Sequence, residues 1–561
     1  MEPSARKTDR PSLCLVLHAH LPWVKRLDHA RFLEESWLHE AVFECYLPLL
    51  RVLDGWKRDH IPAQICFSIS PTLAGMLEDE LLRQRRRARF RAWLDLAERE
   101  ILRATFDPAL RSLAEFQRER LWEALRQLDA LEENPLSGFA QHQREGRVEL
   151  ITSSATHALL PLLTRHPRTL HAQIHLALRE HLRRFASPAS GFWLPECAWS
   201  PELEPILREA GIRWTILESS STSNQVDSPS ISVTPLGLVC WHRDASTAEL
   251  VWSRESGYPG DPRYRDFYRD TGFDAERSYL EPALPCPERA GFTGFKYHAI
   301  RSESGNKQRY DRPAALKAVE EHGWHFIESL SRRARFQNEH APCSPTFGPW
   351  ICPYDAELFG HWWFEGPEFL DAVARHAFHH PQGPRLTTPS AALDFLAASS
   401  KRESRPSPPA WTPPASTWGE GGDLRAWIHP HNAWMRPRIE SLQTRMEQAS
   451  FLSAQPNLTA TATDDSTVLI RRAWNQSVRE LLLAQASDWP FQLRHDARSL
   501  FPRQQFERHA HACEVLLDQL ENHSLDAAFL SRLEQEDSLF PYEPAQSFRN
   551  DSSSRTRTPS F

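Results

Sequence analysis

Short apolar runs separated by helical patterns organise the first four hundred residues. Alternation of strand and helix is typical of βα units around a mainly parallel sheet. About seven such units in one chain favour a barrel over an open sheet. The seven candidate strands are LCLVL (13–17), AQICFSI (63–69), VELIT (148–152), GFWL (191–194), IRWTIL (212–217), GFKYHAI (294–300) and FGPWICPYD (347–355).

Two other regions are helical and highly charged, and Pro and Ser concentrate between the barrel and the second of them. Such a Pro/Ser stretch is typical of a linker, and the polar C-terminus is typical of a disordered tail. We therefore predict a catalytic domain over 12–400 with a helical insertion at 75–145, a linker at 401–416, a C-terminal helical domain at 417–545 and a disordered tail at 546–561.

Composition narrows the possible partners. The 561 residues carry a net charge of −7 without a basic stripe, which argues against a nucleic-acid partner. The nine cysteines are scattered without a CxxC pair, as reduced core thiols would be. The apolar run Leu13–Leu17 is too short for a signal or a membrane span, so the cytoplasm is the expected location, without a membrane partner. The 20 tryptophans suit stacking on sugar rings.

Residues whose side chains can act in catalysis or bind ligands follow four of the predicted strands. His18 and His20 end the first run, His157 follows the third, Glu196 follows the fourth and Asp355 ends the seventh. Functional residues of βα folds gather at the C-terminal ends of the strands. We therefore expect these side chains to line one pocket.

Two interpretations of that pocket compete. His18 and His20 alternate at a strand end and could bind a metal with Asp355 or His361, as in a metal-dependent polysaccharide deacetylase. Alternatively, Glu196 and Asp355 form the carboxylate pair of a glycosidase, and the histidines bind sugar hydroxyls. The many aromatic residues nearby favour the second interpretation, because an oxocarbenium-like transition state needs two carboxylates in an aromatic cleft.

Several long motifs resemble glycoside hydrolase family 57, and within it the 1,4-α-glucan branching enzymes. They are HAHLPWV, GRVELITSSATHALLPLL, GFWLPECAW and PYDAELFGHWWFEGPEFL, extended by WSRESGYPGDPRYRDFYRDTGFD, STWGEGGDLRAWIHPHNAWM and SDWPF. The resemblance implies an α/β fold, an incomplete (β/α)7 barrel with a helical insertion and a C-terminal all-helical domain. It implies no metal and no organic cofactor.

The same resemblance assigns roles to the carboxylates. Glu196 matches the family's nucleophile and Asp355 its general acid/base, and a retaining pair is separated by about 5 Å. Attack on the glucosyl-enzyme by a 6-hydroxyl would form an α-1,6 branch, whereas attack by water would give hydrolysis. The substrate-binding residues implied by the resemblance are His18, His20, Trp37, His157, Tyr258 (on a loop over the site), Trp418, Trp427 and Asp488.

The sequence thus predicts a 1,4-α-glucan branching enzyme of glycogen biosynthesis, acting on an α-glucan as a monomer or weak homo-oligomer. An α-amylase or 4-α-glucanotransferase on the same scaffold is the alternative, since only the acceptor differs. A binding protein that has lost catalysis is a third class. Trp199 and His298 depart from the family pattern and put acceptor binding in question.

Overall fold

A curled, mainly parallel sheet forms the centre of the computed structural model, which describes residues 10–29, 31–219, 230–286, 288–300, 308–340, 348–403, 410–452, 465–542 and 544–548. Its strand order is β6-β7-β5-β4-β3-β2-β1-β8, with β9 paired to β1. Only β6 pairs antiparallel among the described strands. The strands are β1 (Ser12–Ala19), β2 (Ile65–Ile69), β3 (Val148–Ser153), β4 (Gly191–Trp193), β5 (Trp214–Leu217), β6 (Ile231–Val233), β7 (Val239–His242), β8 (Trp350–Asp355) and β9 (Arg385–Leu386).

One contact joins the two ends of this curled sheet. Arg243, directly after β7, forms a parallel bridge with Ile351 of β8, and the Asp244 N–H donates to the Ile351 carbonyl over 2.9 Å. The strands are almost wholly buried, as expected for parallel strands covered by helices. The predicted incomplete (β/α)7 barrel is therefore confirmed.

One predicted strand is wrong. Residues 294–300 lie outside the sheet and make only isolated bridges, from His298 to Arg309 and from Ala299 to Arg265. The strand that takes this place in the barrel is β7, at 239–242. The alternation in GFKYHAI instead reflects a packed loop, in which Phe295 and Tyr297 are buried.

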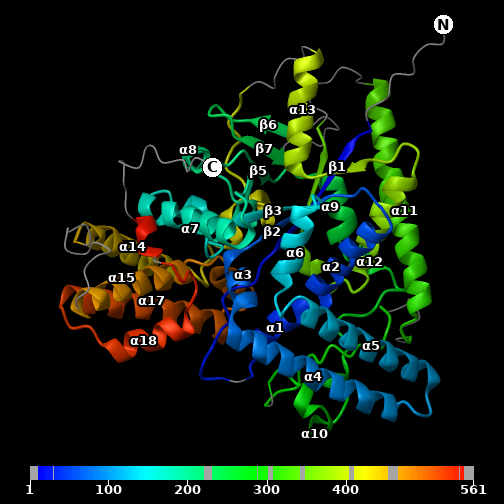
Figure 1. The fold of residues 1–561 in the computed structure, drawn as a ribbon, viewed down its shortest axis with the longest axis horizontal. Helices are drawn as coiled ribbons and strands as arrows, with labels where there is room; N and C mark the ends of the chain where they lie inside the picture. The colour runs from blue at the N-terminus through cyan, green and yellow to red at the C-terminus, as the bar shows by residue number, and fades with distance from the viewer. Residues whose placement is uncertain are drawn as a thin grey trace.

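Helices surround the sheet (Figure 1). Four of them fill the predicted insertion, and each begins at a side-chain cap: Ser70, Asp79, Asp107 and Asn134 accept hydrogen bonds from backbone N–H groups of the first turn. These are α3 (Pro71–Glu78), α4 (Glu80–Arg103), α5 (Pro108–Ala130) and α6 (Pro135–Arg144). The helices after the other strands are α1 (Leu33–Ala41), a π-helical turn (Val42–Tyr46), α2 (Leu47–Arg58), α7 (Pro167–Phe185), α8 (Leu203–Glu209), α9 (Ala245–Trp252), α10 (Arg277–Leu280), α11 (Arg312–His340), α12 (Gly366–His379) and α13 (Pro389–Glu403).

The C-terminal helices pack beside α7, as Figure 1 shows. They are α14 (Met435–Leu452), α15 (Asp465–Ala484), α16 (Asp488–His495), α17 (Leu500–Glu521) and α18 (Ala527–Glu536). A final 3-10 turn, Pro544–Phe548, also packs on α7 and buries Phe548. The predicted disordered tail at 546–561 is therefore wrong for 546–548, and 549–561 lie outside the described residues. Of the predicted linker at 401–416, residues 401–403 belong to α13 and 404–409 are outside the described residues.

Candidate active site

The strand register brings the predicted residues to one end of the barrel. His18 of β1 is paired with Ser68 of β2 on one side and with Asp355 of β8 on the other. His157 and Glu196 follow β3 and β4 directly. Because parallel strands place their carboxyl ends at the same edge, segments far apart in the sequence meet here.

A cavity of about 600 Å³ opens at this edge. Both carboxylates, the three histidines and two of the predicted tryptophans line it. The lining residues are His18, His20, Leu21, His157, Glu196, Arg243, Trp252, Asp355, Glu357, Trp362, Trp418, Gly419, Glu420, Ala426, Trp427, Phe491, Arg494 and His495. A cavity of this size and aromatic content suits a short stretch of an oligosaccharide.

Glu196 is held by backbone and side-chain contacts. Its backbone is left-handed, with φ 60° and ψ 24°, a conformation that costs about 1 kcal/mol or more for a residue with a Cβ. Trp418 fixes it twice: its backbone N–H donates to the Glu196 carbonyl over 3.0 Å, and its indole N–H donates to Oε2 over 2.7 Å. Burial raises the pKa of Glu196 to about 7, although the Trp418 hydrogen bond lowers it. Above this pH the carboxylate is ionised and aimed into the cavity.

Asp355 is the group that holds a proton. Burial raises its pKa well above the ordinary range, and the charges of Glu357 and Glu196 raise it further. Glu357 is itself tied down, since it accepts hydrogen bonds from the Tyr46 hydroxyl and from the His20 backbone N–H. A protonated Asp355 can donate to a departing oxygen, while an ionised Glu196 can attack a carbon.

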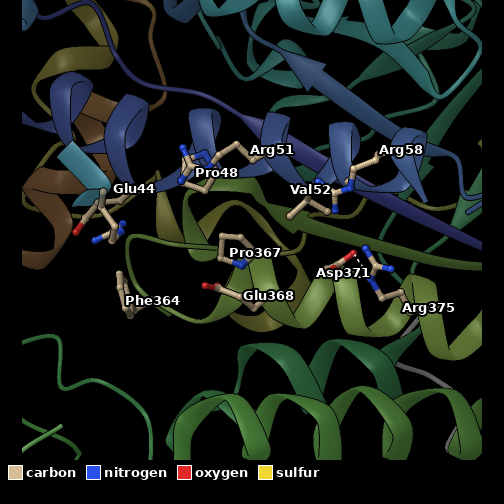
Figure 2. A pocket seen from close by; sticks show the side chains of 12 residues that line it. Glu44, Pro48, Arg51, Val52, Arg58, Phe364, Pro367, Glu368, Asp371 and Arg375 are labelled. Atoms are coloured by element: carbon tan, nitrogen blue, oxygen red, sulfur yellow. Dashed lines mark hydrogen bonds and ion pairs between the residues drawn. The ribbon is translucent and has the colours of Figure 1, made fainter. Parts of the chain in front are cut away.

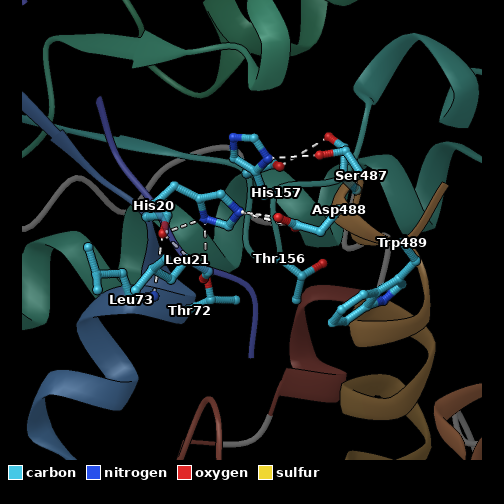
Figure 3. Close-up of polar contacts among 12 residues, drawn as sticks. His20, Leu21, Thr72, Leu73, Thr156, His157, Ser487, Asp488 and Trp489 are labelled. Carbon is cyan, nitrogen blue, oxygen red and sulfur yellow. Dashed lines mark hydrogen bonds and ion pairs between the residues drawn. The ribbon is translucent and has the colours of Figure 1, made fainter. Parts of the chain in front are cut away.

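Two short hydrogen-bond chains organise the histidines (Figure 3). His157 contacts His18 through Nε2 at 2.9 Å and the Ser487 hydroxyl through Nδ1 at 2.8 Å. His20 contacts the Ser70 hydroxyl at 2.9 Å and Asp488 at 3.1 Å. The rings of His20 and His157 stack with centroids 3.7 Å apart.

Two of these histidines are held neutral. Burial, together with the charge of His20, lowers the pKa of His18 and His157 well below 6.5. Both are therefore neutral hydrogen-bonding groups at physiological pH.

Comparison with known proteins identifies the family. The model of glycosyl hydrolase family 57 matches residues 14–335. The chain belongs to glycosyl hydrolase family 57. A second model, 1,4-alpha-glucan branching enzyme, C-terminal, matches residues 453–546.

Relatives of known structure or curated function share most of their length with this family 57 chain. A 1,4-alpha-glucan branching enzyme of Thermococcus kodakarensis is 27% identical, over 94% of this chain and 77% of its own. The crystal structure of a GH57-type branching enzyme from Pyrococcus horikoshii superimposes with a TM-score of 0.81 at 27% identity, covering 96% of this chain and 97% of that one. The crystal structure of the alpha-amylase AmyC from Thermotoga maritima superimposes with a TM-score of 0.84 at 31% identity. It covers 96% of this chain and 99% of that one.

The metal-site interpretation fits this family 57 chain less well. His361 binds Glu44 at 2.7 Å and is not among the residues lining the cavity. His20, His157 and Asp488 do place potential ligand atoms within 4.8 Å of one another. However, both ring nitrogens of His157 already bind His18 and Ser487. The three residues form a hydrogen-bonded unit rather than an open ligand set.

The structure brings Asp488 to the site, and it places two other predicted residues elsewhere. Asp488 reaches His20 from the start of α16. Trp37 packs edge-to-face on Phe501, with ring centroids 5.8 Å apart, and does not line the cavity. Tyr258 also lies away from the cavity, buried against α11, where its hydroxyl binds His325 at 2.7 Å.

Several cavity residues were not predicted from the sequence. Arg243 was not predicted because it follows β7, the strand that was itself not predicted. It donates to Glu218 over 2.8 Å, and its guanidinium lies 5.6 Å from the Trp418 ring centroid. Trp362, Phe491 and Arg494 stand inside the family motifs or next to them, but nothing in their spacing marks them as cavity residues.

Proposed function

We propose that the protein is a retaining 1,4-α-glucan branching enzyme. The observation that carries this proposal is the pair of carboxyl groups in one aromatic cavity, with Asp355 protonated and Glu196 poised to ionise. Membership of family 57 supports it, as do the branching-enzyme relatives and the C-terminal match. Substrate is an α-glucan with α-1,4 linkages.

The proposed reaction has two steps. Glu196 attacks the anomeric carbon while Asp355 gives its proton to the departing 4-oxygen, which leaves a covalent glucosyl-enzyme. The 6-hydroxyl of an acceptor glucan then attacks that carbon and loses its proton to Asp355, which releases Glu196 and forms the α-1,6 branch.

Other cavity residues position the sugars in this proposal. Trp418 and Trp427 offer aromatic faces for stacking. The neutral imidazoles of His18 and His157, with His20 beside them, provide hydrogen bonds to hydroxyls at the cavity floor. Trp37 and Tyr258 have no such role in the conformation described.

The cellular setting is proposed from the cysteines and the helices. The eight described cysteines are all unpaired, and seven of them are buried, which fits a reducing compartment. Among the described residues no helix is both long and apolar enough to cross a membrane. We place the enzyme in the cytoplasm, in glycogen biosynthesis, as a monomer or weak homo-oligomer with its barrel, linker and C-terminal domain in one chain.

Hydrolysis is the second candidate, because the structural relative AmyC is an α-amylase. Tyr258, expected on a loop over the site, is packed away from the cavity. The acceptor therefore decides between two activities that share Glu196 and Asp355.

Incubation with amylose tests both candidates. We expect new α-1,6 linkages, seen after debranching, with few new reducing ends. Glu196→Gln and Asp355→Asn should each lose about a thousandfold or more in rate, whereas the exposed Glu202→Gln should keep the activity. Reducing ends without branches would establish the amylase instead, and full activity in Glu196→Gln would remove both candidates.

A further inference from the structure

A second, smaller cavity lies on the side of the barrel, away from the active site. Its volume is about 130 Å³, and α1, α4 and the segment around 281–285 enclose it. Three arginines face it, against one carboxylate. The lining residues are Arg31, Phe32, Glu35, Ser36, His39, Arg85, Ala88, Arg89, Ala92, Pro282 and Pro285.

Arg89 is the unusual member of this group. Its side chain is 7% exposed, and its Nη1 donates to the Leu284 carbonyl over 2.6 Å. Its Nε and Nη2 have no hydrogen-bond partner, and no carboxylate of the described residues forms an ion pair with it. Burial lowers its pKa to about 10, which leaves the group charged at neutral pH. The charges of Glu40, Asp270 and Glu35 raise this pKa, and the guanidinium carbon lies 5.1 Å from the Trp93 ring centroid. The two N–H groups without an acceptor are nevertheless buried, which is costly unless an acceptor arrives from outside.

His39 adds a second unpartnered group to the same cavity. It is 4% exposed, and its Nε2 donates to Glu35 over 3.3 Å. Its Nδ1 has no partner. The single carboxylate is already occupied, because Glu35 also forms an ion pair with Arg85 at 2.7 Å. Burial lowers the pKa of His39, so with Nε2 donating its Nδ1 is a neutral acceptor. The open donors of the cavity are therefore those of Arg89.

The cleft between α2 and α12 makes a useful contrast (Figure 2). It is also rich in arginine, but Arg375 and Arg58 are paired with carboxylates, and Arg120 lies over the Phe43 and Phe364 rings. Arg375 lies 2.9 Å from Asp371 and 2.8 Å from Asp59, and Arg58 pairs with Asp59. An anion would have to displace these carboxylates, whereas at Arg89 it would meet open donors.

We infer that the cavity around Arg89 binds a small oxyanion, with a phosphate group as the ligand that it fits. Guanidinium forks match tetrahedral oxyanions through paired N–H donors, and Arg31 adds positive charge at the rim. The cavity volume of about 130 Å³ can hold one phosphate group and little more. The bound group would join the insertion helix α4 to α1 and to the segment at 281–285. This inference does not depend on the proposed function.

The test uses the full-length protein and inorganic phosphate as the probe, with sodium chloride at matched ionic strength as the reference. Calorimetric titration should show saturable binding of one phosphate, with a dissociation constant of about 1 mM or tighter. Glucose 1-phosphate is titrated in parallel. If glucose 1-phosphate binds at least tenfold more tightly than inorganic phosphate, the natural ligand is a sugar phosphate. If the two bind equally, the natural ligand is free phosphate.

Arg89→Met keeps the apolar stem and removes the buried charge. Without phosphate, the variant should unfold at the same temperature as the wild type or higher, and its phosphate affinity should fall at least tenfold. The control is Arg91→Met, an exposed arginine of the same helix outside the cavity, which should bind phosphate normally. Absence of saturable phosphate binding in the wild-type protein, or undiminished binding by Arg89→Met, would overturn the inference.

Discussion

At the scale of single residues, the Trp418 indole adjusts the pKa of Glu196, the nucleophile of the proposed reaction. Its N–H donates to the Glu196 carboxylate, which lowers a pKa that burial has raised to about 7. Attack needs the ionised form, so kcat/KM should rise with pH through about 7. A hydrogen bond to a charged acceptor contributes about 1.5–3 kcal/mol, which corresponds to about one to two pKa units.

Trp418→Phe keeps an aromatic face for the sugar but removes this donor. We expect the rise of kcat/KM to move to higher pH by about one to two units. Trp427→Phe is the matched control, because the Trp427 indole N–H has no hydrogen-bond partner among the described residues. The measurement is a pH profile of branching on amylose for both variants. An equal displacement of the two profiles would contradict this role for Trp418.

The reactive residues themselves could be read from the sequence because they stand at strand ends within long motifs. Glu196, Asp355 and the three histidines all line the cavity. Their protonation states could not be read in this way. They depend on burial and on partners from remote segments, such as Trp418 acting on Glu196 and the charge of Glu196 acting on Asp355.

At the scale of elements, most barrel strands were predictable from their apolar runs, but β7 was not. β1 and β8 are buried over most of their length and stand out in the sequence. β4 and β5 are no longer than β7, yet they stand within the predicted runs 191–194 and 212–217. The alternating segment at 294–300 was taken in place of β7. The packed loop that contains Phe295 and Tyr297 buries alternate residues without joining the sheet.

Tyr258 belongs to another element whose position differs from expectation. It lies in a 3-10 turn (Tyr258–Gly260) that packs on α11, with its ring stacked on His322 at 4.6 Å. Tyr258→Phe should cost about 1 kcal/mol of stability through the lost hydrogen bond to His325. The ratio of branches to reducing ends should stay unchanged, measured on amylose. A large fall in that ratio would show that the hydroxyl acts over the active site.

At the scale of the whole molecule, the raised pKa of Glu196 opposes stability. Between the ordinary value of 4.5 and about 7, the folded protein holds a proton that the unfolded chain has lost. The contribution of this group to stability therefore falls as pH rises through that window, and stays low above it.

Glu196→Gln removes this penalty together with the nucleophile. We expect the variant to be more stable than the wild type by about 1–3 kcal/mol near pH 8, after allowance for partial exposure, and nearly equal to it near pH 4. Thermal unfolding at both pH values measures the difference. Glu209→Gln, at an exposed position, should show no such pH-dependent gain. A gain of the same size at both pH values would mean that the charge of Glu196 is not its cause.

The cavity wall runs from His18 near the start of the chain to His495 in α16. Ser487 forms two hydrogen bonds with His157. Its hydroxyl contacts Nδ1 of the ring, and its backbone N–H donates to the His157 carbonyl. During synthesis on the ribosome, the barrel emerges long before these partners do. A nascent chain therefore carries both carboxylates without a finished pocket, so newly made protein is inert toward polysaccharide until translation is almost complete.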